Sequence, residues 1–584
     1  AGSFAVVMSM RPYQTDPIVN HFIGKYFVRL GIPVIPADAL PGLNEIDLSD
    51  LRVRVRSNSQ ATLYAAAKVV ATNPHLELGH IASFGCGHDA VVCDELERIV
   101  QDAGKQVLIL KLDESDVRGP LRIRITSFVE TVRQERRRVQ PKTNGKGFPW
   151  PKFTRGDAHK RTIYVPNLSV AFSRVLGAVV ENGGWHVKVL PLADDRAIEV
   201  GQHYLHTDIC FPAQINVGEF LRVIETDKPD PDGIALGMHQ NCGACRAGQY
   251  AMLARKALDH AGLTSVPIVT SGDELRHLHP GFGISAKMQV QLVRGFAVMD
   301  ALEDMRRSTR PYELREGATN AVFEKSLEEL CANVGNGRHA VFDVLEKAVV
   351  RFNRIRLSRE SPRPTALVLG EILLAVHPSS NYQLEAYLER HGLEVIGTRL
   401  SDFFHSGFVV SRAESQQWFE RKPWLTALVD KTCDALFMRA LYRTEDIMSA
   451  YARHRPRVSA REIYKSASPW IDKIHSAGEG WLILGEIMHS AEHGVNSFVV
   501  LQPFGCMPNH IFGRGVARVV KEAHPQAHVL CLDFDPDTSM GNIENRLQML
   551  IMNARELDRL NFSTPNQAFR PVVNTDGSQT RGHL

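Results

Sequence analysis

The chain has 584 residues, of which 44% are hydrophobic and 23% charged, and its formal net charge is +3. This is the composition of an ordinary globular protein, and a charge so near zero argues against a nucleic-acid-binding role. One hydrophobic core cannot organise a chain of this length, so we expect three or four domains.

The cysteine content excludes a disulfide-stabilised secreted protein. There are nine cysteines, an odd and small number for this length. We recognise no signal peptide and no apolar run long enough to span a bilayer. The sequence therefore predicts a reduced, cytoplasmic protein that does not enter a membrane. Residues 1–3, Ala-Gly-Ser, are interpreted as the scar of a cleaved tag.

Residues 4–132 are predicted to form a first α/β domain, because short apolar runs alternate with amphipathic segments. The expected strands are 4–9, 32–35, 78–83 and 107–112, and the expected helices are 17–30, 61–71 and 89–103. Residues 133–161 are rich in Lys, Arg, Pro and Gly and are read as a basic linker. The basic residues of this segment are expected to be simply solvated. The alternative is that they bind an acidic partner or a CoA phosphate.

A second α/β domain is expected over 162–283, followed by a helical insertion over 284–360. The expected strands are 162–166, 185–190, 233–238 and 266–270, and the expected helices are 170–181, 213–224 and 249–261. Helical periodicity without strand signals is typical of a cap. We expect the insertion to cover a site and exclude water from it.

Residues 361–560 are predicted to form a third α/β domain, and 561–584 a disordered tail rich in polar residues, Pro and Gly. The expected strands are 365–369, 393–397, 497–501 and 527–532, and the expected helices are 382–391, 484–492 and several within 416–454. The fold class is thus α/β: several doubly wound parallel-sheet domains with a helical insertion and a cofactor between domains.

Three of the predicted strands end in a cysteine with a neighbouring glycine, and a helix follows each time. These cysteines are Cys86, Cys245 and Cys506. A fourth, Cys210, precedes Pro212 at the start of a helical pattern, where the helix dipole and free amides favour a thiolate. Since ligands of open α/β sheets bind at the carboxyl ends of the strands, these loops are the first candidate site.

Four such thiolates are what a 4Fe-4S cluster requires. Zinc is the alternative metal, but its structural sites usually show two short cysteine pairs, and only Cys242 and Cys245 have that spacing. A double cubane would need more thiolates than these four, with Cys242 the one extra cysteine nearby. We therefore favour a single cubane, while the role of Cys242 stays open.

At these residues the chain resembles the family of activators of (R)-2-hydroxyglutaryl-CoA dehydratase, also called acyl-CoA dehydratase activase-related proteins. It is similar to the part of the long members that lies beyond their ATPase modules, from near residue 5 to near residue 555. The stretches that carry the resemblance are Arg11-Pro12-Tyr13, Ser83-Phe84-Gly85-Cys86-Gly87, 111–114, 208–212, Cys245-Arg246, Arg310-Pro311-Tyr312-Glu313, Gly370-Glu371, His377-Pro378, 502–510 and 533–536.

The resemblance implies a relative of cluster-bearing dehydratase subunits and double-cubane reductases of anaerobic metabolism. Its cluster ligands would be the four cysteines named above, and its electrons would come from a separate ATPase activator with its own iron-sulfur cluster. The chain has neither a P-loop nor a dinucleotide-binding fingerprint, which agrees with a partner ATPase. An acyl-CoA or another small molecule is the implied substrate, and a homo-oligomer is one option for its assembly.

His510 is the candidate proton donor, because it follows Cys506 in a loop at the carboxyl edge of a strand. His88, His206 and His239 lie near the other cysteines, and loop histidines of this kind are more often structural than functional. The remaining cysteines are read as core residues: Cys93, Cys331, Cys433 and Cys531. We expect an iron-sulfur dehydratase or reductase, with a non-catalytic electron-transfer or scaffold protein, or a structural zinc protein, as alternatives.

Overall fold

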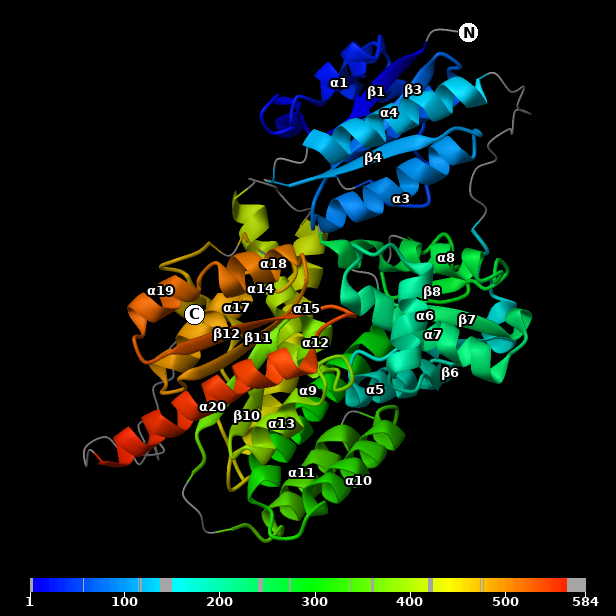
Figure 1. Cartoon of the computed structure of the whole chain (residues 1–584). Helices are drawn as coiled ribbons and strands as arrows, with labels where there is room; N and C mark the ends of the chain where they lie inside the picture. The colour runs from blue at the N-terminus through cyan, green and yellow to red at the C-terminus, as the bar shows by residue number, and fades with distance from the viewer. Residues whose placement is uncertain are drawn as a thin grey trace.

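The computed structural model describes most of the chain, and the described residues form three four-stranded parallel sheets (Figure 1). The described residues are 4–55, 57–113, 115, 118–136, 150–239, 245–272, 275–337, 339–358, 362–417, 424–472, 474–475 and 477–563. The predicted α/β class with several doubly wound parallel-sheet domains is confirmed.

The first sheet has the strand order β2-β1-β3-β4. Its strands are β1 (Ala5–Ser9), β2 (Val34–Pro36), β3 (Leu76–Ser83) and β4 (Val107–Leu112). Apolar side chains of α1 and α4 pack on one face, and those of α2 and α3 on the other. These helices are α1 (Ile23–Arg29), α2 (Asn58–Thr72), α3 (Gly87–Gln101) and α4 (Arg118–Glu135).

The second sheet repeats this arrangement with the order β6-β5-β7-β8. Its strands are β5 (Thr162–Val165), β6 (His186–Val189), β7 (Ile234–Met238) and β8 (Ile268–Thr270). Its helices are α5 (Val170–Asn182), α6 (Asp195–Tyr204), α7 (Phe211–Asp227) and α8 (Tyr250–His260).

The third sheet has the order β10-β9-β11-β12. Its strands are β9 (Thr365–Gly370), β10 (Glu394–Gly397), β11 (Ser497–Pro503) and β12 (His528–Phe534). Its helices are α12 (Ile372–Val376), α13 (Leu384–Arg390), α17 (Trp481–Glu492), α18 (Met507–Asn509), α19 (Ala517–Ala523) and α20 (Met540–Ser563). Between β10 and α17 lie α14 (Leu400–Gln417), α15 (Trp424–Met448) and α16 (Ala460–Ala467).

All three sheets therefore share one topology, in which the first and third strands of each domain are neighbours. From the first strand the chain moves toward one edge of the sheet, and from the third strand it moves toward the other edge. This point of reversal opens a crevice at the carboxyl ends of the two strands, which is where such sheets bind ligands. The third strands, β3, β7 and β11, are the ones followed by Cys86, Cys245 and Cys506.

The first and third domains also repeat a left-handed turn that shortens two predicted helices. His21 and Phe22 have φ of 52° and 56°, and Tyr382 and Gln383 have φ of 55° and 58°. In each turn the second residue donates its amide to a proline carbonyl five residues earlier, at 2.8 Å. Because an α-helix cannot pass through left-handed residues, α1 and α13 begin only after these turns.

The segment predicted as a helical insertion is helical, but it does not cover the cysteine loops. Its helices are α9 (Ala286–Thr309), α10 (Ala318–Asn333) and α11 (Ala340–Asn353). They share a core with α5 and α15, and α10 and α11 lie at the end of the molecule opposite the first domain (Figure 1). The expected role as a water-excluding cap is therefore wrong.

Two amphipathic helices were missed in stretches rich in charge. In α4 the buried residues follow a helical stripe: Leu121, Ile125, Phe128, Val129 and Val132. α4 also reaches into the start of the predicted linker, ending at Glu135. α20 buries Ile543, Leu547 and Leu550 in the same way against the third sheet. The central part of the linker, 137–149, and the tail beyond 563 lie outside the described residues.

α7 of the second domain packs against both of the other domains. Ala213 and Phe220 of α7 belong to the same core as α2 and α3 of the first domain, whereas Phe211 and Ile215 belong to the core of the third. A buried pair supports the second contact, since His377 Nε2 lies 3.0 Å from Glu219 Oε1 on α7. The helix that begins at Cys210 is thus held from two sides.

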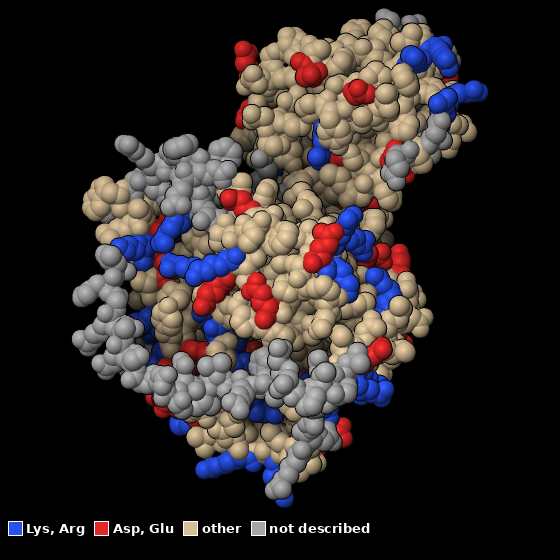
Figure 2. Space-filling view, turned by 90° about the vertical axis from the view of Figure 1, so that its left-hand side faces the viewer, with Lys and Arg blue, Asp and Glu red and all other residues tan. Residues whose placement is uncertain are grey.

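In the view of Figure 2, Lys and Arg are interspersed with Asp and Glu, so this side of the surface has no large region of one charge. This agrees with the low net charge. Among the described helices, none combines the length and the apolar character that crossing a membrane requires.

We predict that Gly218→Ala lowers the stability of the protein by about 1–3 kcal/mol or more. A Cβ at Gly218 would lie 1.9 Å from the carbonyl oxygen of Ala197, so α6 and α7 would have to separate. The measurement is the urea midpoint of unfolding. Gly119→Ala is the matched control, because a Cβ at Gly119 would meet open space, and it should leave the midpoint unchanged or raise it. Equal midpoints for both variants would contradict the packing argument.

Candidate functional site at the cysteine loops

Each of the four predicted cysteines occupies the N-cap position of a helical segment. Cys86 precedes α3, Cys210 precedes α7, Cys506 precedes α18, and Cys245 precedes a 3₁₀ turn at Arg246–Gln249. The first amides of a helix have no partner within it, so each thiol lies beside donors that favour negative charge. The position predicted for Cys210 is confirmed, and the other three share it.

The loops of Cys86 and Cys506 pack directly against each other. Gly85 and Gly505 have φ of 69° and 66°, and a Cβ on Gly505 would lie 2.5 Å from the carbonyl oxygen of Gly85. The preceding rings, Phe84 and Phe504, meet edge to face with centroids 6.2 Å apart. Glycine is required here both for the left-handed turn and for the close approach of the two loops.

Arg246 connects all four cysteine loops. Its side chain fills the space where a Cβ on Gly87 would lie, 2.2 Å from Arg246 Cδ. Its guanidinium donates to the carbonyl oxygen of Asp208 at 3.0 Å and to that of Phe504 at 3.2 Å. Gly87 directly follows Cys86, Asp208 lies two residues before Cys210, and Phe504 lies two residues before Cys506. Arg246 itself directly follows Cys245.

The charge of Arg246 is buried, since the residue is only 8% exposed. Burial lowers its pKa, but the acidic groups around it, Cys210 and Cys506 first, keep the pKa above its ordinary value. In the sequence, Arg246 stands out only as part of the resemblance, and this role was not predicted. The signal available was its position directly after a candidate ligand.

A second arginine reaches the site from the end of β1. Arg11 Nη2 donates to Cys86 Sγ at 3.3 Å and to Asp89 Oδ1 at 2.6 Å. Asp89 is fixed in turn, because its other oxygen accepts from the amide of Ser83 at 2.8 Å. The neighbouring first and third strands of the domain thus place a cation beside a thiol.

The thiols of Cys210 and Cys506 also have polar partners. Tyr250 Oη lies 3.0 Å from Cys210 Sγ, and Asn509 Nδ2 donates to Cys506 Sγ at 3.3 Å. Burial nevertheless raises the pKa of both thiols. The expectation that the helix N-terminus favours a thiolate at Cys210 is wrong for the protein alone, because desolvation outweighs the dipole. A bound metal would have to displace these protons.

Two buried carboxyl groups lie on the third-domain side of the site. Glu371 follows β9 and accepts from the amide of Leu374 at 2.9 Å. Glu479 accepts from the amide of Ile372 at 2.9 Å and from Asn509 Nδ2 at 3.2 Å. Burial and the neighbouring Glu479 raise the pKa of Glu371. Burial also raises the pKa of Glu479. Asn509 thus links a proton-holding pair to Cys506.

His510 lies on the same helical turn as Cys506. Its Nδ1 is 2.8 Å from the carbonyl oxygen of Cys506, and its Nε2 is 3.5 Å from Asp533 Oδ1. Asp533 also accepts from Gln502 Nε2 at 2.6 Å. Both ring nitrogens therefore face groups of the third domain, and the role of His510 as proton donor stays a prediction.

The other histidines and cysteines contribute less to the site. His206 Nδ1 accepts from the amide of Asp208, whose carboxylate pairs with Lys111 of the first domain at 2.6 Å. His239 lies 3.5 Å from Ser271 Oγ. Cys242 lies outside the described residues. The cysteines predicted as core residues lie in α3, α10, α15 and β12, buried or half-buried: Cys93, Cys331, Cys433 and Cys531.

Comparison with known proteins finds no family model that matches the chain and no curated protein that matches it. Its function is therefore inferred from the arrangement of its own residues.

We predict that stability falls as the pH is lowered from about 6.5 toward 4 because of His80 on β3. Burial lowers the pKa of His80 to about 4, and its Nδ1 donates to the carbonyl of Ser9 at 2.9 Å. Below pH 6.5 the unfolded chain binds a proton that the folded protein does not, which costs up to about 3 kcal/mol. His80→Asn, which retains a donor at the Nδ1 position, should flatten this dependence of the urea midpoint on pH. The exposed His186→Asn is the control, and identical pH profiles for wild type and His80→Asn would contradict the prediction.

Proposed function

We propose that Cys86, Cys210, Cys245 and Cys506 hold a 4Fe-4S cluster, and that the protein uses electrons received there for a dehydration or reduction. The observation that carries the proposal is the contact of one buried side chain, Arg246, with the loops of all four cysteines. These contacts link loops of the three domains whose cysteines are up to 420 residues apart in the sequence.

The donor set fits an iron-sulfur cluster. Four thiols at helix N-caps supply the ligands, and two arginines beside them offset the negative charge of a thiolate-ligated cluster. In the same loops there is no room for a side chain at Gly87 or Gly505, and Gly85 has a positive φ that favours glycine. When bound, such a cluster supplies one-electron chemistry at low potential.

Zinc is the alternative metal for the same cysteines. Its structural sites usually show two short cysteine pairs, and only Cys242 and Cys245 have that spacing in the sequence. The sequence spacing therefore favours the cluster over zinc.

Electrons would be supplied by a partner, in line with the resemblance to proteins served by an ATPase activator. Phe84 and Phe504 are 62% and 48% exposed and directly precede the glycines of the Cys86 and Cys506 loops. These rings form an apolar surface next to two of the proposed ligands. A redox partner that docked on it would come close to the cluster.

For a catalytic role, the chain offers proton donors beside the cysteines. Glu371 and Glu479 hold a proton in a buried site, and Asn509 connects Glu479 to Cys506. His510 is a second candidate one helical turn away. The residues would bind and protonate a small molecule or acyl-CoA while electrons enter through the cysteine-held group.

A non-catalytic electron carrier is the second candidate, and it is favoured by a cleft that lies away from the four cysteines. A cleft of about 390 Å³ lies between the second and third domains, lined by Asp194, Ile198, Ser379 and Tyr382 among others. It touches none of the four cysteines. An electron carrier needs no substrate cavity at its cluster, whereas a catalyst does.

We predict that anaerobically reconstituted protein is brown and contains about four iron per chain. Cys506→Ser should lose most of this iron, and so should the quadruple variant of the four proposed ligands. Cys433→Ser, on α15, is the matched control and should keep it. Elemental analysis and the visible spectrum are the measurements.

Full iron content in the quadruple variant would exclude these ligands. Zinc without iron after reconstitution would favour the zinc alternative, and about eight iron per chain would indicate a double cubane.

We predict that the cluster spectrum of protein reduced by an ATPase activator with ATP changes when the correct acyl-CoA or small molecule is added. Glu479→Gln and His510→Ala should each lower turnover by about 10²–10⁴-fold, the usual contribution of a proton donor, with iron content unchanged. The exposed His186→Ala should leave turnover unchanged. If the cluster accepts electrons but no compound perturbs it, the carrier function holds instead.

A further inference from the structure

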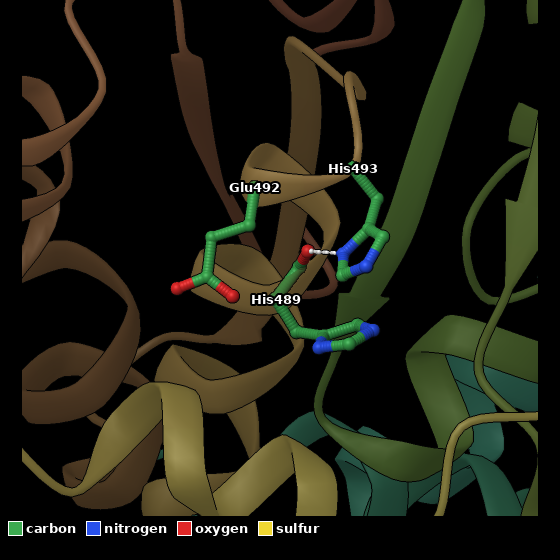
Figure 3. A group of neighbouring side chains, drawn as sticks. All are labelled: His489, Glu492 and His493. Carbon is green, nitrogen blue, oxygen red and sulfur yellow. Dashed lines mark hydrogen bonds between the residues drawn. The ribbon is translucent and has the colours of Figure 1, made fainter. Parts of the chain in front are cut away.

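The last turn of α17 carries three metal-binding side chains that play no part in the cysteine site. They are His489, Glu492 and His493, shown in Figure 3. One ligand atom of each lies within 4.8 Å of those of the other two. His489 lies eight residues beyond Trp481, at the start of α17, which is about 12 Å along the helix. The group therefore lies at the C-terminal end of α17, whereas Glu479 and Cys506 lie near its N-terminal end.

His493 is oriented as metal-binding histidines usually are. His493 Nδ1 donates to the carbonyl oxygen of His489 at 2.7 Å, the bond drawn in Figure 3. This bond fixes the proton on Nδ1 and leaves the lone pair of Nε2 available. The spacing of four residues puts both rings on one face of the helix, with centroids 4.2 Å apart.

The carboxylate is also supported from outside the helix. Ser466 on α16 donates to Glu492 Oε2 at 2.8 Å, and its hydroxyl lies 3.5 Å from His489 Nδ1. A hydrogen-bonded carboxylate beside two imidazoles is the usual surrounding of a protein metal site. Ser466 thus contacts two of the three donors from a neighbouring helix.

The group combines partial burial with one negative charge. His489 is half-buried, whereas Glu492 and His493 are exposed. The carboxylate of Glu492 beside two imidazoles favours a cation over an anion.

We propose that His489, Glu492 and His493 bind one Zn²⁺ ion at the end of α17, with Ser466 of α16 supporting Glu492 through its hydrogen bond. Two imidazole nitrogens and one carboxylate oxygen are ligands that zinc accepts at about 2.0–2.2 Å, and water completes the tetrahedron. Small side-chain rotations bring donors now within 4.8 Å to that spacing. This site is independent of the function proposed for the cysteines.

The test is equilibrium dialysis of the cluster-loaded protein against Zn²⁺, with zinc and iron per chain measured together. Loading the cysteines with iron first keeps them from taking up the zinc. Wild type should bind one zinc ion that His489→Ala/His493→Ala lacks. Glu492→Gln should weaken this binding by at least about tenfold, and Ser466→Ala by about tenfold. Iron content and the circular dichroism spectrum should be the same in all variants.

The exposed His186→Ala on β6 is the matched control and should bind zinc as the wild type does. Equal zinc stoichiometry and affinity in wild type and the double histidine variant would overturn the proposal. So would zinc that binds only before the cysteines are loaded, because that zinc would occupy the thiols. A Glu492→Gln variant with unchanged affinity would also contradict the three-ligand site.

Discussion

The cysteine site depends on one buried guanidinium. Arg246 fits against Gly87 of the first domain, donates to Asp208 in the second and donates to Phe504 in the third. A buried cation is costly unless acceptors and negative groups surround it. The three loops provide backbone acceptors and thiols around Arg246. The buried guanidinium is therefore stabilised only when the three domains are in contact, and it stabilises that contact in turn.

The repeated topology explains why these loops can meet. Each sheet reverses direction between its first and third strands, and each third strand delivers a cysteine to the crevice formed there. Residues after the first strands then reach the same crevices: Arg11 after β1 and Glu371 after β9. One structural unit, used three times, thus places cysteine loops, a cation and an acid at the carboxyl ends of neighbouring strands, and α7 contacts both neighbouring domains.

Much of the fold could be predicted because it is encoded locally. Strands β3, β7 and β11 are apolar runs that end in glycine and cysteine, and the helices after them have clear amphipathic periods. The predictions failed where a local signal was weak or was overruled. His21 and Phe22 carry no glycine to mark a left-handed turn, and the charged residues of α4 obscured its apolar stripe. α9 to α11 were predicted correctly as helices, but their position was not.

The sequence alone determined the parallel α/β architecture, the cysteines that follow strands and the position of Cys210 at a helix N-terminus, because these follow from patterns within about 30 residues of chain. Only the tertiary structure decided which side chains share a site. The contact of Arg246 with Phe504 spans 258 residues, and Glu371 and Glu479 come together across a gap of more than a hundred. Their charges and pKa values depend on burial by other domains, which no stretch of sequence contains. The same holds for the zinc group, where Ser466 meets Glu492 only because α16 packs against α17.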